Sequence, residues 1–170
     1  SFIRDNDLKV KYVLLTHAHV DHAASAEILA KKYGVEVCGN IGDESLAQNL
    51  ADQAMRFHLP VKLSPLTFGR HLSDGDVLML GLEQINVITT PGHSEGGLTY
   101  YVPTSCFACV GDTIFDGSIG RTDLPGGDFE TLIDSIKKKI FTLPDETVLF
   151  SGHGPSTSVI REKNYNPYVQ

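Results

Sequence analysis

The chain has 170 residues, 41% of them hydrophobic, which predicts one domain, residues 1–170, with enough apolar side chains for a sizeable core. Fourteen Lys and Arg against 21 Asp and Glu give a net charge of -7, so a nucleic acid would meet repulsion over most of the surface. No apolar run approaches the roughly 20 residues that span a bilayer, and the opening "SFIRDNDLK" lacks the pattern of a signal peptide. We therefore expect a cytoplasmic protein with neither nucleic-acid nor membrane partners. The chain has no initiating Met, and we expect its natural N-terminus to lie upstream.

Strand-like and helix-like segments alternate along the chain without repeats or a linker, which predicts a single α/β unit. In chain order these segments are an apolar run up to Leu15, a helix from Ala23 to Tyr33 ended by Gly34, a short strand "VEVC", a helix from Asp43 as N-cap to about Phe57, the strands "VLML", "INVITT", "LTYYV" and "CFACV", a helix from Asp128 to Phe141, and a strand at 147–151. The lysines near the end of the last helix should face solvent. Its apolar stripe, which should lie on the sheet, comprises Phe129, Leu132, Ile133, Ile136 and Ile140.

Cys106 and Cys109 form a C-x-x-C pair, a spacing that occurs in redox and zinc sites. Here the pair falls in "SCFACVG", which is expected to be a strand, and side chains three apart on a strand point to opposite faces. The sequence has three cysteines, so no second pair is present to complete a metal site. We therefore predict that these cysteines pack within the strand, and the odd number argues against a disulfide framework.

Five of the seven histidines and two aspartates come just after predicted strands. The motif "THAHVDH", residues 16–22, follows the first apolar run, "TPGH" follows a second strand, and two further strands are followed by "GD" and "SGH". Loops at one end of a layered α/β domain converge, so these side chains are expected to meet. The residues expected in this cluster are His17, His19, Asp21, His22, His93, Asp112 and His153. His58 and His71 follow no such strand and are expected to be ordinary surface or core histidines.

Imidazoles and carboxylates crowded together would leave unpaired polar groups and repelling charges unless a positive ion neutralised them, which predicts a metal site. His17 and His19 lie two apart at a strand end and project from the same side, ready to share one metal ion. Asp21 and His22, where the chain turns into a helix, are displaced from that pair and suit a second ion. Five histidines and two aspartates exceed the ligands that one metal uses, so two metal ions are expected.

The motifs "THAHVDH", "TPGHS", "GDTIF" and "SGHGP" together resemble the metal-ligand motifs of the metallo-β-lactamase superfamily. Within it, "GSIGRTDLPGGD" and the ending "HGPSTSVIREKNYNPYV" are similar to the short glyoxalase II-like hydrolases of the YcbL type. The resemblance implies an αββα sandwich with a dinuclear centre, whose metals are commonly zinc, iron or manganese. It also implies that one metal would be held by His17, His19 and His93, the second by Asp21, His22 and His153, and that Asp112 would bridge them.

The sequence departs from this family pattern at both ends. Members normally begin with several β-strands ahead of the histidine motif, so about 40 residues of sheet are expected to be absent here, at ordinary strand and turn lengths. The longer glyoxalase II enzymes carry a C-terminal helical domain whose basic residues bind the glutathione carboxylates, whereas this chain ends soon after His153. Glutathione specificity therefore does not follow from the resemblance.

The expected ligand set predicts a hydrolase without a serine or cysteine nucleophile, because a hydroxide held between two metals attacks an acyl carbon near neutral pH. We expect hydrolysis of a small-molecule thioester such as S-lactoylglutathione, because a departing thiolate is itself a soft metal ligand. Asp21 and Asp112 are the carboxylates of the site on which catalysis should depend. Arg121 and Asp123, in the "GRTD" stretch, either orient ligands or contact substrate, or else form a loop salt bridge.

Other functions are compatible with the same residues. Persulfide dioxygenases of the superfamily share the GRTD-like stretch and use one iron, which residues corresponding to His17, His93 and Asp112 would hold. Lactonases and nucleases of the superfamily share the ligands, although the acidic balance argues against a nuclease. From a different class, the chain could be a non-catalytic binding module that keeps its metals for stability.

Overall fold

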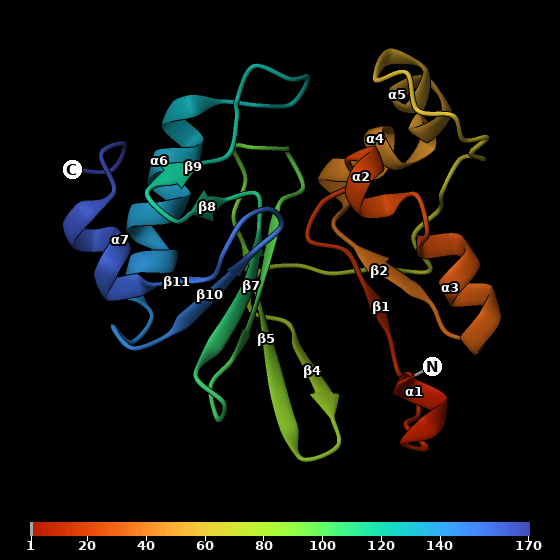
Figure 1. The fold of residues 1–170 in the computed structure, drawn as a ribbon, viewed down its shortest axis with the longest axis horizontal. Coiled ribbons are helices and arrows are strands. Elements are labelled where there is room, and N and C mark those ends of the chain that lie inside the picture. Colours follow the sequence, from red (N-terminus) through yellow and green to blue (C-terminus); the bar gives the residue numbers. More distant parts are fainter. Residues whose placement is uncertain (1) are drawn as a thin grey trace.

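The computed structural model describes residues 2–170, which fold into two facing halves with β-sheets on the inside and helices on the outside (Figure 1). Helices α2 to α5 lie on the N-terminal half, and α6 and α7 lie on the C-terminal half. The layers therefore run helix, sheet, sheet, helix, which is the αββα sandwich that the resemblance implied.

The N-terminal half is built from short elements around a parallel sheet. In chain order they are α1 (Phe2–Asp5), β1 (Val13–Leu14), α2 (Val20–Ala23), α3 (Ala26–Tyr33), β2 (Val37–Gly39), the 3-10 turn η1 (Ile41–Asp43), α4 (Glu44–Gln48), α5 (Leu50–Arg56) and β3 (Arg70–His71). The three strands are parallel and lie in the order β1, β2, β3. The strand "VEVC" of the sequence prediction is β2 within this sheet.

The C-terminal half is organised around a six-stranded mixed sheet. Its strands are β4 (Val77–Leu80), β5 (Glu83–Thr89), β6 (Leu98–Val102), β7 (Phe107–Gly111), β10 (Val148–Ser151) and β11 (Thr157–Ser158). β4 to β7 form an antiparallel meander, β10 lies parallel to β7, and β11 is antiparallel to β10. The other elements of this half are the β8–β9 hairpin (Ile114–Phe115 and Ser118–Ile119), α6 (Phe129–Lys138), the 3-10 turn η2 (Ile140–Thr142) and α7 (Val159–Tyr165).

The helix predicted from Ala23 to Tyr33 is two helices, α2 and α3, so the prediction is wrong at its start. The His19 carbonyl accepts hydrogen bonds from the amides of His22 and Ala23, at 3.0 and 2.9 Å, and these bonds start α2 inside the histidine motif. The predicted end is confirmed, because Gly34 caps α3 with a φ of 65°. Glycine adopts this left-handed conformation without the penalty of a Cβ.

The helix predicted from Asp43 to Phe57 is interrupted at Asn49, which separates α4 from α5. Asn49 has φ -104° and ψ 26°, and its side-chain amide donates to the Ser45 carbonyl at 2.8 Å. Such a local bond offers the backbone an alternative to the regular helical pattern. Asp43 precedes α4, yet its side chain does not cap the helix, because its carboxylate is bonded elsewhere.

The helix predicted from Asp128 to Phe141 corresponds to α6 followed by η2. Leu132, Ile136 and Ile140 are completely buried against the second sheet, which confirms the central part of the apolar stripe. Phe129 is 46% exposed and does not belong to the stripe. α6, with 10 residues, is the longest helix of residues 2–170, and none of these helices is long and apolar enough to cross a membrane.

Cys106 lies in a turn, so its placement in a strand was wrong. Its φ of 51° is left-handed, and its amide donates to the Pro103 carbonyl at 3.2 Å, which closes the turn between β6 and β7. Cys109 lies on β7, and both thiols are free. The C-x-x-C pair therefore spans the end of a turn and the strand after it, and it forms no disulfide.

The core between the two sheets fixes the strand ends relative to each other. Leu72, Leu78 and Leu98 are almost completely buried in this layer, and two further apolar clusters lie between each sheet and its helices. Close packing of this kind transmits position across the interface, so loops from the two sheets can form one site.

Candidate metal centre

The candidate site lies where strand ends from both sheets meet. β1 runs into the histidine motif, β5 leads to His93, β7 leads directly to Asp112, and β10 leads to His153. The convergence was predicted from the sequence, and the structure brings the whole predicted set together: His17, His19, Asp21, His22, His93, Asp112 and His153.

Two hydrogen bonds from β6 hold the histidine motif against the second sheet. The Leu98 amide donates to the Thr16 carbonyl at 2.7 Å, and the Tyr100 hydroxyl donates to the Leu15 carbonyl at 2.6 Å. Burial raises the pKa of Tyr100, so the phenol stays protonated and remains a donor. The start of the motif is therefore fixed from across the sheet interface.

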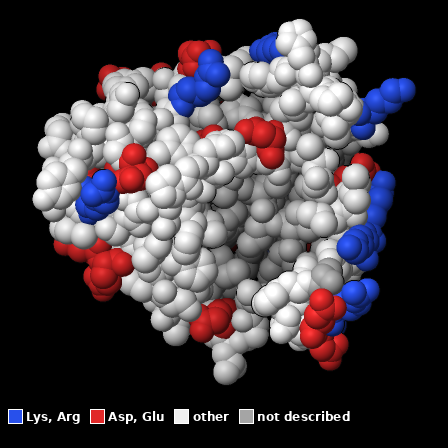
Figure 2. All heavy atoms as spheres, viewed as in Figure 1, with Lys and Arg blue, Asp and Glu red and all other residues white. Residues whose placement is uncertain are grey.

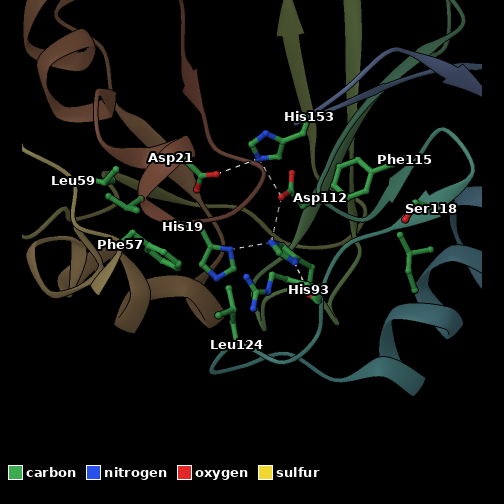
Figure 3. A pocket seen from close by; sticks show the side chains of 13 residues that line it. His19, Asp21, Phe57, Leu59, His93, Asp112, Phe115, Ser118, Leu124 and His153 are labelled. Carbon is green, nitrogen blue, oxygen red and sulfur yellow. Dashed lines mark hydrogen bonds and ion pairs between the residues drawn. The ribbon is translucent and has the colours of Figure 1, made fainter. Parts of the chain in front are cut away.

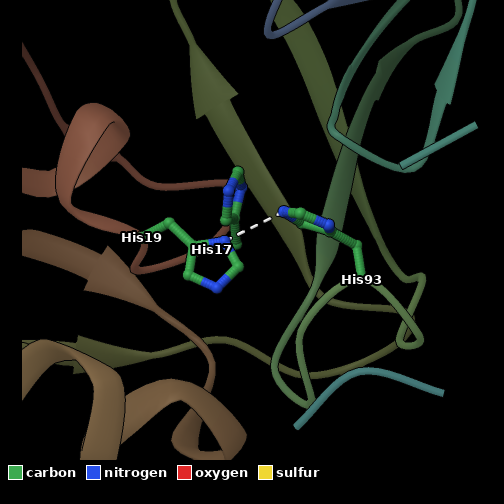
Figure 4. A group of neighbouring side chains, drawn as sticks. All are labelled: His17, His19 and His93. Atoms are coloured by element: carbon green, nitrogen blue, oxygen red, sulfur yellow. Dashed lines mark hydrogen bonds between the residues drawn. The ribbon is translucent and has the colours of Figure 1, made fainter. Parts of the chain in front are cut away.

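Three histidines form the buried part of the cluster (Figure 4). His17, His19 and His93 are each at most 6% exposed. His19 Nδ1 lies 2.9 Å from His93 Nε2, and the His17 ring centre lies 4.9 and 4.8 Å from the ring centres of His19 and His93. The three rings thus direct one nitrogen each toward a common point, with all three nitrogens within 4.8 Å of one another.

The protonation of these rings suits metal binding. His93 Nδ1 donates to the Arg121 carbonyl at 2.7 Å, which leaves a lone pair on Nε2 facing His19. Burial and the neighbouring imidazoles lower the pKa of His19 to about 4, and the same causes also lower the pKa of His17. Both rings are therefore neutral at neutral pH, and the neutral imidazole is the form that binds a metal.

Three side-chain atoms of the cluster are buried without a hydrogen-bond partner in residues 2–170: His17 Nε2, His19 Nε2 and Asp112 Oδ1. A buried polar atom without a partner costs roughly 1–3 kcal/mol. A divalent cation held by His17 Nε2 and Asp112 Oδ1 would satisfy these two atoms, and imidazole nitrogen with carboxylate oxygen is a donor set for zinc and iron. His19 would reach such an ion through Nδ1, the nitrogen that faces His93, and not through its unpaired Nε2. The residues present therefore fit a metal centre.

A second group of donors lies toward solvent and consists of Asp21, His22 and His153. His153 Nε2 lies 3.1 Å from Asp21 Oδ2 and 3.3 Å from His22 Nε2. The side chains of Asp21 and His153 are 52% and 58% exposed, whereas His22 is largely covered. This group coincides with the residues that the resemblance assigned to the second metal, and their role as ligands stays a prediction.

Asp112 lies between the two groups. Its Oδ1 is 3.4 Å from His22 Nε2, and its Oδ2 is 3.6 Å from His93 Nε2 and 3.5 Å from His153 Nε2. Burial alone would raise the pKa of Asp112, but its close contact with His22 and the charges of the surrounding histidines lower it. An ionised carboxylate in this position can face two cations at once.

Gly152 has no side chain, and the Asp112 and His22 side chains occupy the space where its Cβ would lie. A Cβ at Gly152 would collide with the Asp112 carboxylate and would lie 2.5 Å from His22 Cε1. The Gly152 amide also donates to the Gly111 carbonyl at 2.9 Å, so the loops after β7 and β10 pack backbone to backbone. A residue without a side chain is therefore required here.

Sequence reasoning missed Asp43, which ties the two main ligand loops together. Its carboxylate accepts hydrogen bonds from the Ala18 amide at 2.8 Å, the Ser94 hydroxyl at 3.0 Å and the Gly96 amide at 2.6 Å. Ala18 lies between two cluster histidines, and Ser94 follows the third. The pattern of a helix N-cap hid this role, because Asp directly before a helical segment ordinarily indicates a cap.

Gln53 is a second residue that the sequence did not single out. Its side-chain oxygen accepts from the Val20 amide at 3.0 Å, and its amide nitrogen donates to the carbonyls of Leu46, at 2.8 Å, and Ala18, at 3.2 Å. A polar residue in a helix ordinarily faces solvent, so the sequence carries no signal for this contact. Gln53 fixes α5 against the histidine motif.

Arg121 and Asp123 form the loop salt bridge that was one of the two interpretations of the "GRTD" stretch. Two hydrogen bonds of 2.7 Å join the guanidinium to both carboxylate oxygens, and this contact lowers the pKa of Asp123 to about 2. Arg121 also lines the cavity over the cluster, and its backbone carbonyl orients His93. The loop therefore contacts the site through its main chain.

A cavity of about 580 Å³ lies over the cluster (Figure 3). Its polar part is formed by His19, Asp21, His93, Asp112 and His153, and its apolar part includes Phe57, Leu59, Phe115, Ile119 and Leu124. Figure 2 shows that the surface is hollowed between the two halves, and that most charged side chains on this face lie toward the outline of the molecule, away from the hollow. Its size and mixed lining are typical of a small-molecule site.

His58 and His71 lie outside the cluster, as predicted. His71 Nε2 pairs with Glu44 Oε2 at 3.0 Å near the start of α4. His58 follows α5 with a φ of 54° and lies in the turn that ends this helix.

The sequence profile described as "Metallo-beta-lactamase superfamily" matches residues 1–153. The chain therefore belongs to the metallo-β-lactamase superfamily, as its motifs indicated. It is 39% identical over 168 residues to the Haemophilus influenzae protein "Hydroxyacylglutathione hydrolase GloC", a match that covers 98% of this chain and 79% of that protein. It is 38% identical over 171 residues to the Bacillus subtilis protein "Probable metallo-hydrolase YqgX", covering 99% and 80%.

Solved structures agree with this assignment. The crystal structure of BLEG-1 B3 metallo-beta-lactamase superposes with a TM-score of 0.90 at 31% identity, covering 99% of this chain and 81% of that one. TTHA1623 in a di-iron-bound form gives 0.89 at 34% identity, covering 98% and 81%. ETHE1 from Myxococcus xanthus gives 0.76 at 26% identity, covering 98% and 65%. The chain thus has the metallo-β-lactamase fold, and one of these similar proteins was solved with iron bound.

Proposed function

We propose that this chain is a metal-dependent hydrolase of small-molecule thioesters such as S-lactoylglutathione. The observation that carries the proposal is the pair of donor groups, one of three buried histidines and one of Asp21, His22 and His153, placed on either side of Asp112. The similar H. influenzae protein, named as a hydroxyacylglutathione hydrolase, supports the choice of a thioester among possible acyl substrates.

The seven residues would hold two divalent ions of zinc, iron or manganese. His17, His19 and His93 would bind the first ion, and Asp21, His22 and His153 the second, with Asp112 shared between them. When bound, such a pair supplies a hydroxide near neutral pH and polarises an acyl carbonyl.

The protein's own groups would orient the reactants and admit the substrate. The Arg121 carbonyl holds the His93 ring at 2.7 Å, which fixes the direction of its free nitrogen. Phe57, Leu59 and Phe115 give the cavity an apolar wall that can cover the substrate and exclude water from part of it. Asp21 and His153 are more than half exposed, so the leaving thiol departs most directly on their side of the cluster.

The test is thiol release from S-lactoylglutathione by protein of known metal content. We expect close to two metal ions per chain and cleavage of the thioester. Chelation should abolish the activity and lower the melting temperature. Restoring the metal should restore both properties. Metal well below one equivalent after reconstitution, with unchanged melting, would contradict the metal centre.

A fully metal-loaded protein can also separate the proposal from its alternatives. Activity on a persulfide with oxygen uptake, and none on thioesters, would favour a persulfide dioxygenase. A loaded protein inactive on thioesters, lactones, phosphodiesters and persulfides would instead indicate a binding module that keeps its metals for stability.

A further inference from the structure

A second pocket, of about 320 Å³, adjoins the cavity over the cluster and runs along α4 and α5. The two hollows share His19, Phe57 and Leu124 in their linings. Among the seven cluster residues, only His19 lines the second pocket. The pocket therefore adjoins the buried group of three histidines and lies away from the exposed group.

The helical side of this pocket is polar. Ser45, Asn49, Asp52 and Arg56 line it at intervals of four, three and four residues, and all four are exposed. Asp52 and Arg56, four residues apart, lie on one face of α5, and Ser45 of α4 and Asn49 at the break line the same side of the pocket. On a flat surface this face would simply be solvated, but here it forms the wall of a hollow that reaches a candidate metal ligand.

The position of this wall relative to the cluster is fixed. Gln53, from the same α5 helix, bonds the Val20 amide at 3.0 Å and the Ala18 carbonyl at 3.2 Å, on either side of His19. A ligand that spans from the cluster to α5 would therefore meet polar groups that are already in place. Such preorganisation reduces the cost of ordering the site on binding.

One arginine lines each pocket, and the two differ in whether a carboxylate pairs with them. Arg121 is bonded through two nitrogens to the Asp123 carboxylate, so its charge is matched internally. Arg56 makes no ion pair with any residue from 2 to 170, and neither does Asp52, one turn earlier. Arg56 is thus the cation in these pockets that is free to bind an anionic group of a ligand.

The exposure of the cluster sets the direction in which a thioester lies. Asp21 and His153 face solvent, so a leaving thiol would depart on their side, and the acyl chain would then extend from the scissile bond toward the buried histidines. On that side His19 opens into the second pocket, where Leu46, Phe57, Leu124 and Pro125 offer apolar contacts for methylene groups.

We propose that the pocket along α4 and α5 binds the acyl group, and that Arg56 selects acyl groups that end in a carboxylate. The inference rests on the proposed thioesterase function and names the acyl class for that site. The substrate would be a thioester of a dicarboxylic acid, with its free carboxylate on the Arg56 guanidinium. Asp52 opposes this anion from one turn away and limits its affinity.

The test compares S-succinylglutathione with S-butyrylglutathione, which share the thiol and the chain length but differ in a terminal carboxylate or methyl group. We expect the wild-type enzyme to prefer the succinyl substrate by about tenfold in kcat/KM, the effect of one exposed charge-assisted contact. Arg56→Gln should remove this preference mainly by raising KM, while leaving the butyryl substrate unaffected. Asp52→Asn should increase the preference, because it removes a repelling charge.

Arg70→Gln is the matched control, since Arg70 is an exposed arginine on β3 that lines neither pocket. It makes the same change in net charge and should keep the wild-type preference. High salt should weaken the succinyl preference and leave butyryl turnover unchanged. Equal preference in the wild type and Arg56→Gln, with active thioester cleavage, would overturn the acyl pocket and leave the proposed function intact.

Calorimetric binding of succinate and butyrate to the metal-loaded protein gives a readout that does not depend on turnover. Succinate should bind several-fold more tightly than butyrate, and Arg56→Gln should abolish the difference. Arg56-dependent succinate binding by a protein that cleaves no thioester would support the pocket and overturn the thioesterase. Equal binding of the two acids together with no cleavage would overturn both.

Discussion

The buried carboxylate of Asp43 accepts a hydrogen bond from the Ser94 hydroxyl at 3.0 Å, and this contact joins the two halves of the protein beside the cluster. Asp43 comes from the turn before α4, whereas Ser94 directly follows a cluster histidine in the loop after β5. Because the same carboxylate also holds the amide between His17 and His19, one side chain sets the spacing of all three buried histidines.

Asp43→Asn should weaken metal binding more than its small change in volume suggests. The Ala18 and Gly96 amides donate to opposite oxygens of the carboxylate, so an amide NH₂ group would face one of these donors in either orientation. We expect a loss of roughly 2–4 kcal/mol in the free energy of unfolding and at least tenfold in metal affinity. Urea unfolding and a competition titration with a chelator measure the two effects.

Ser94→Ala is the graded control for this prediction, because it removes one of the three bonds and leaves the carboxylate charged. Its cost should be about 1 kcal/mol, with metal affinity reduced only slightly. Wild-type metal affinity in a folded Asp43→Asn protein would show that the carboxylate does not position the ligands.

Gly152→Ala should damage the cluster without unfolding the protein. The new Cβ would collide with the Asp112 carboxylate and press on the His22 ring, which forces Asp112 away from its place between the two donor groups. We expect thioester turnover to fall by about tenfold or more, and metal content to fall toward one ion per chain. Activity assays and elemental analysis of the purified variant check this outcome.

Gly75→Ala is the comparison for Gly152→Ala. Gly75 lies in the turn before β4 and lines no part of the cavity over the cluster. Its φ is 84° and a Cβ there meets no atom within 4 Å, so the change introduces backbone strain without a collision. It should cost about 1 kcal/mol of stability and leave turnover and metal content unchanged. If both alanine variants lost activity to the same extent, a general loss of stability would explain the result.

The metal-free protein should lose stability between pH 7 and pH 5. Burial and neighbouring imidazoles hold the pKa of His19 at about 4, below its ordinary 6.5, so in this window the unfolded chain binds a proton that the folded chain does not. The free energy of unfolding should therefore fall as the pH is lowered, by on the order of 1–2 kcal/mol for His19. His17, whose pKa is also lowered, acts in the same direction.

His22 acts in the opposite direction. Burial lowers the pKa of His22, but the close contact with the charged Asp112 carboxylate, together with the charge of Asp21, raises it overall. This shift stabilises the folded state in acid and makes the fall in stability between pH 7 and pH 5 smaller. Urea unfolding of chelated protein at pH 7 and pH 5 measures the net change in the free energy of unfolding that these histidines cause together. His19→Gln should flatten the dependence, and equal stability of the wild type at the two pH values would refute the expected sign.

The donor set was predictable because a sequence records spacing and strand ends directly. His17 and His19 were expected on one side of a strand end, and the apolar runs before His93 and His153 were recognisable as strands, so their convergence followed from the topology of a layered domain. The same signals placed β4 to β6, β7 apart from Cys106, and α6 apart from its predicted end.

The remaining features depend on contacts between distant segments, which local patterns do not encode. Asp43 resembles a helix cap until the loops that carry Ala18 and Ser94 are folded beside it. The break between α4 and α5 arises from the Asn49 side chain bonding to the backbone, in a segment whose apolar spacing favours a continuous helix. The second pocket was not predictable from the sequence either, because Arg56 and Leu124 are distant in the chain and line the same pocket only once the protein has folded.

Asp21→Ala separates the thioesterase from the persulfide dioxygenase, because only the hydrolase requires the exposed donor group. The change removes the carboxylate that lies 3.1 Å from His153 Nε2, and it leaves His17, His93 and Asp112 in place. In a dinuclear thioesterase the loss of this ligand should cost on the order of a hundredfold or more in turnover, with metal content falling toward one ion. A mononuclear iron enzyme should keep most of its activity, since its chemistry needs open positions on one iron only.

The paired assays are thiol release from S-lactoylglutathione and oxygen uptake with glutathione persulfide, each run on wild type and variant with metal content measured. Asp145→Ala is the control, because Asp145 is a surface carboxylate that pairs with Lys163 at 2.6 Å and lines no part of the cavity. It should leave both activities unchanged. Oxygen uptake by the wild type that largely survives in Asp21→Ala, together with negligible thioester cleavage, would replace the hydrolase assignment with the dioxygenase, because the exposed donors would then be dispensable for the chemistry.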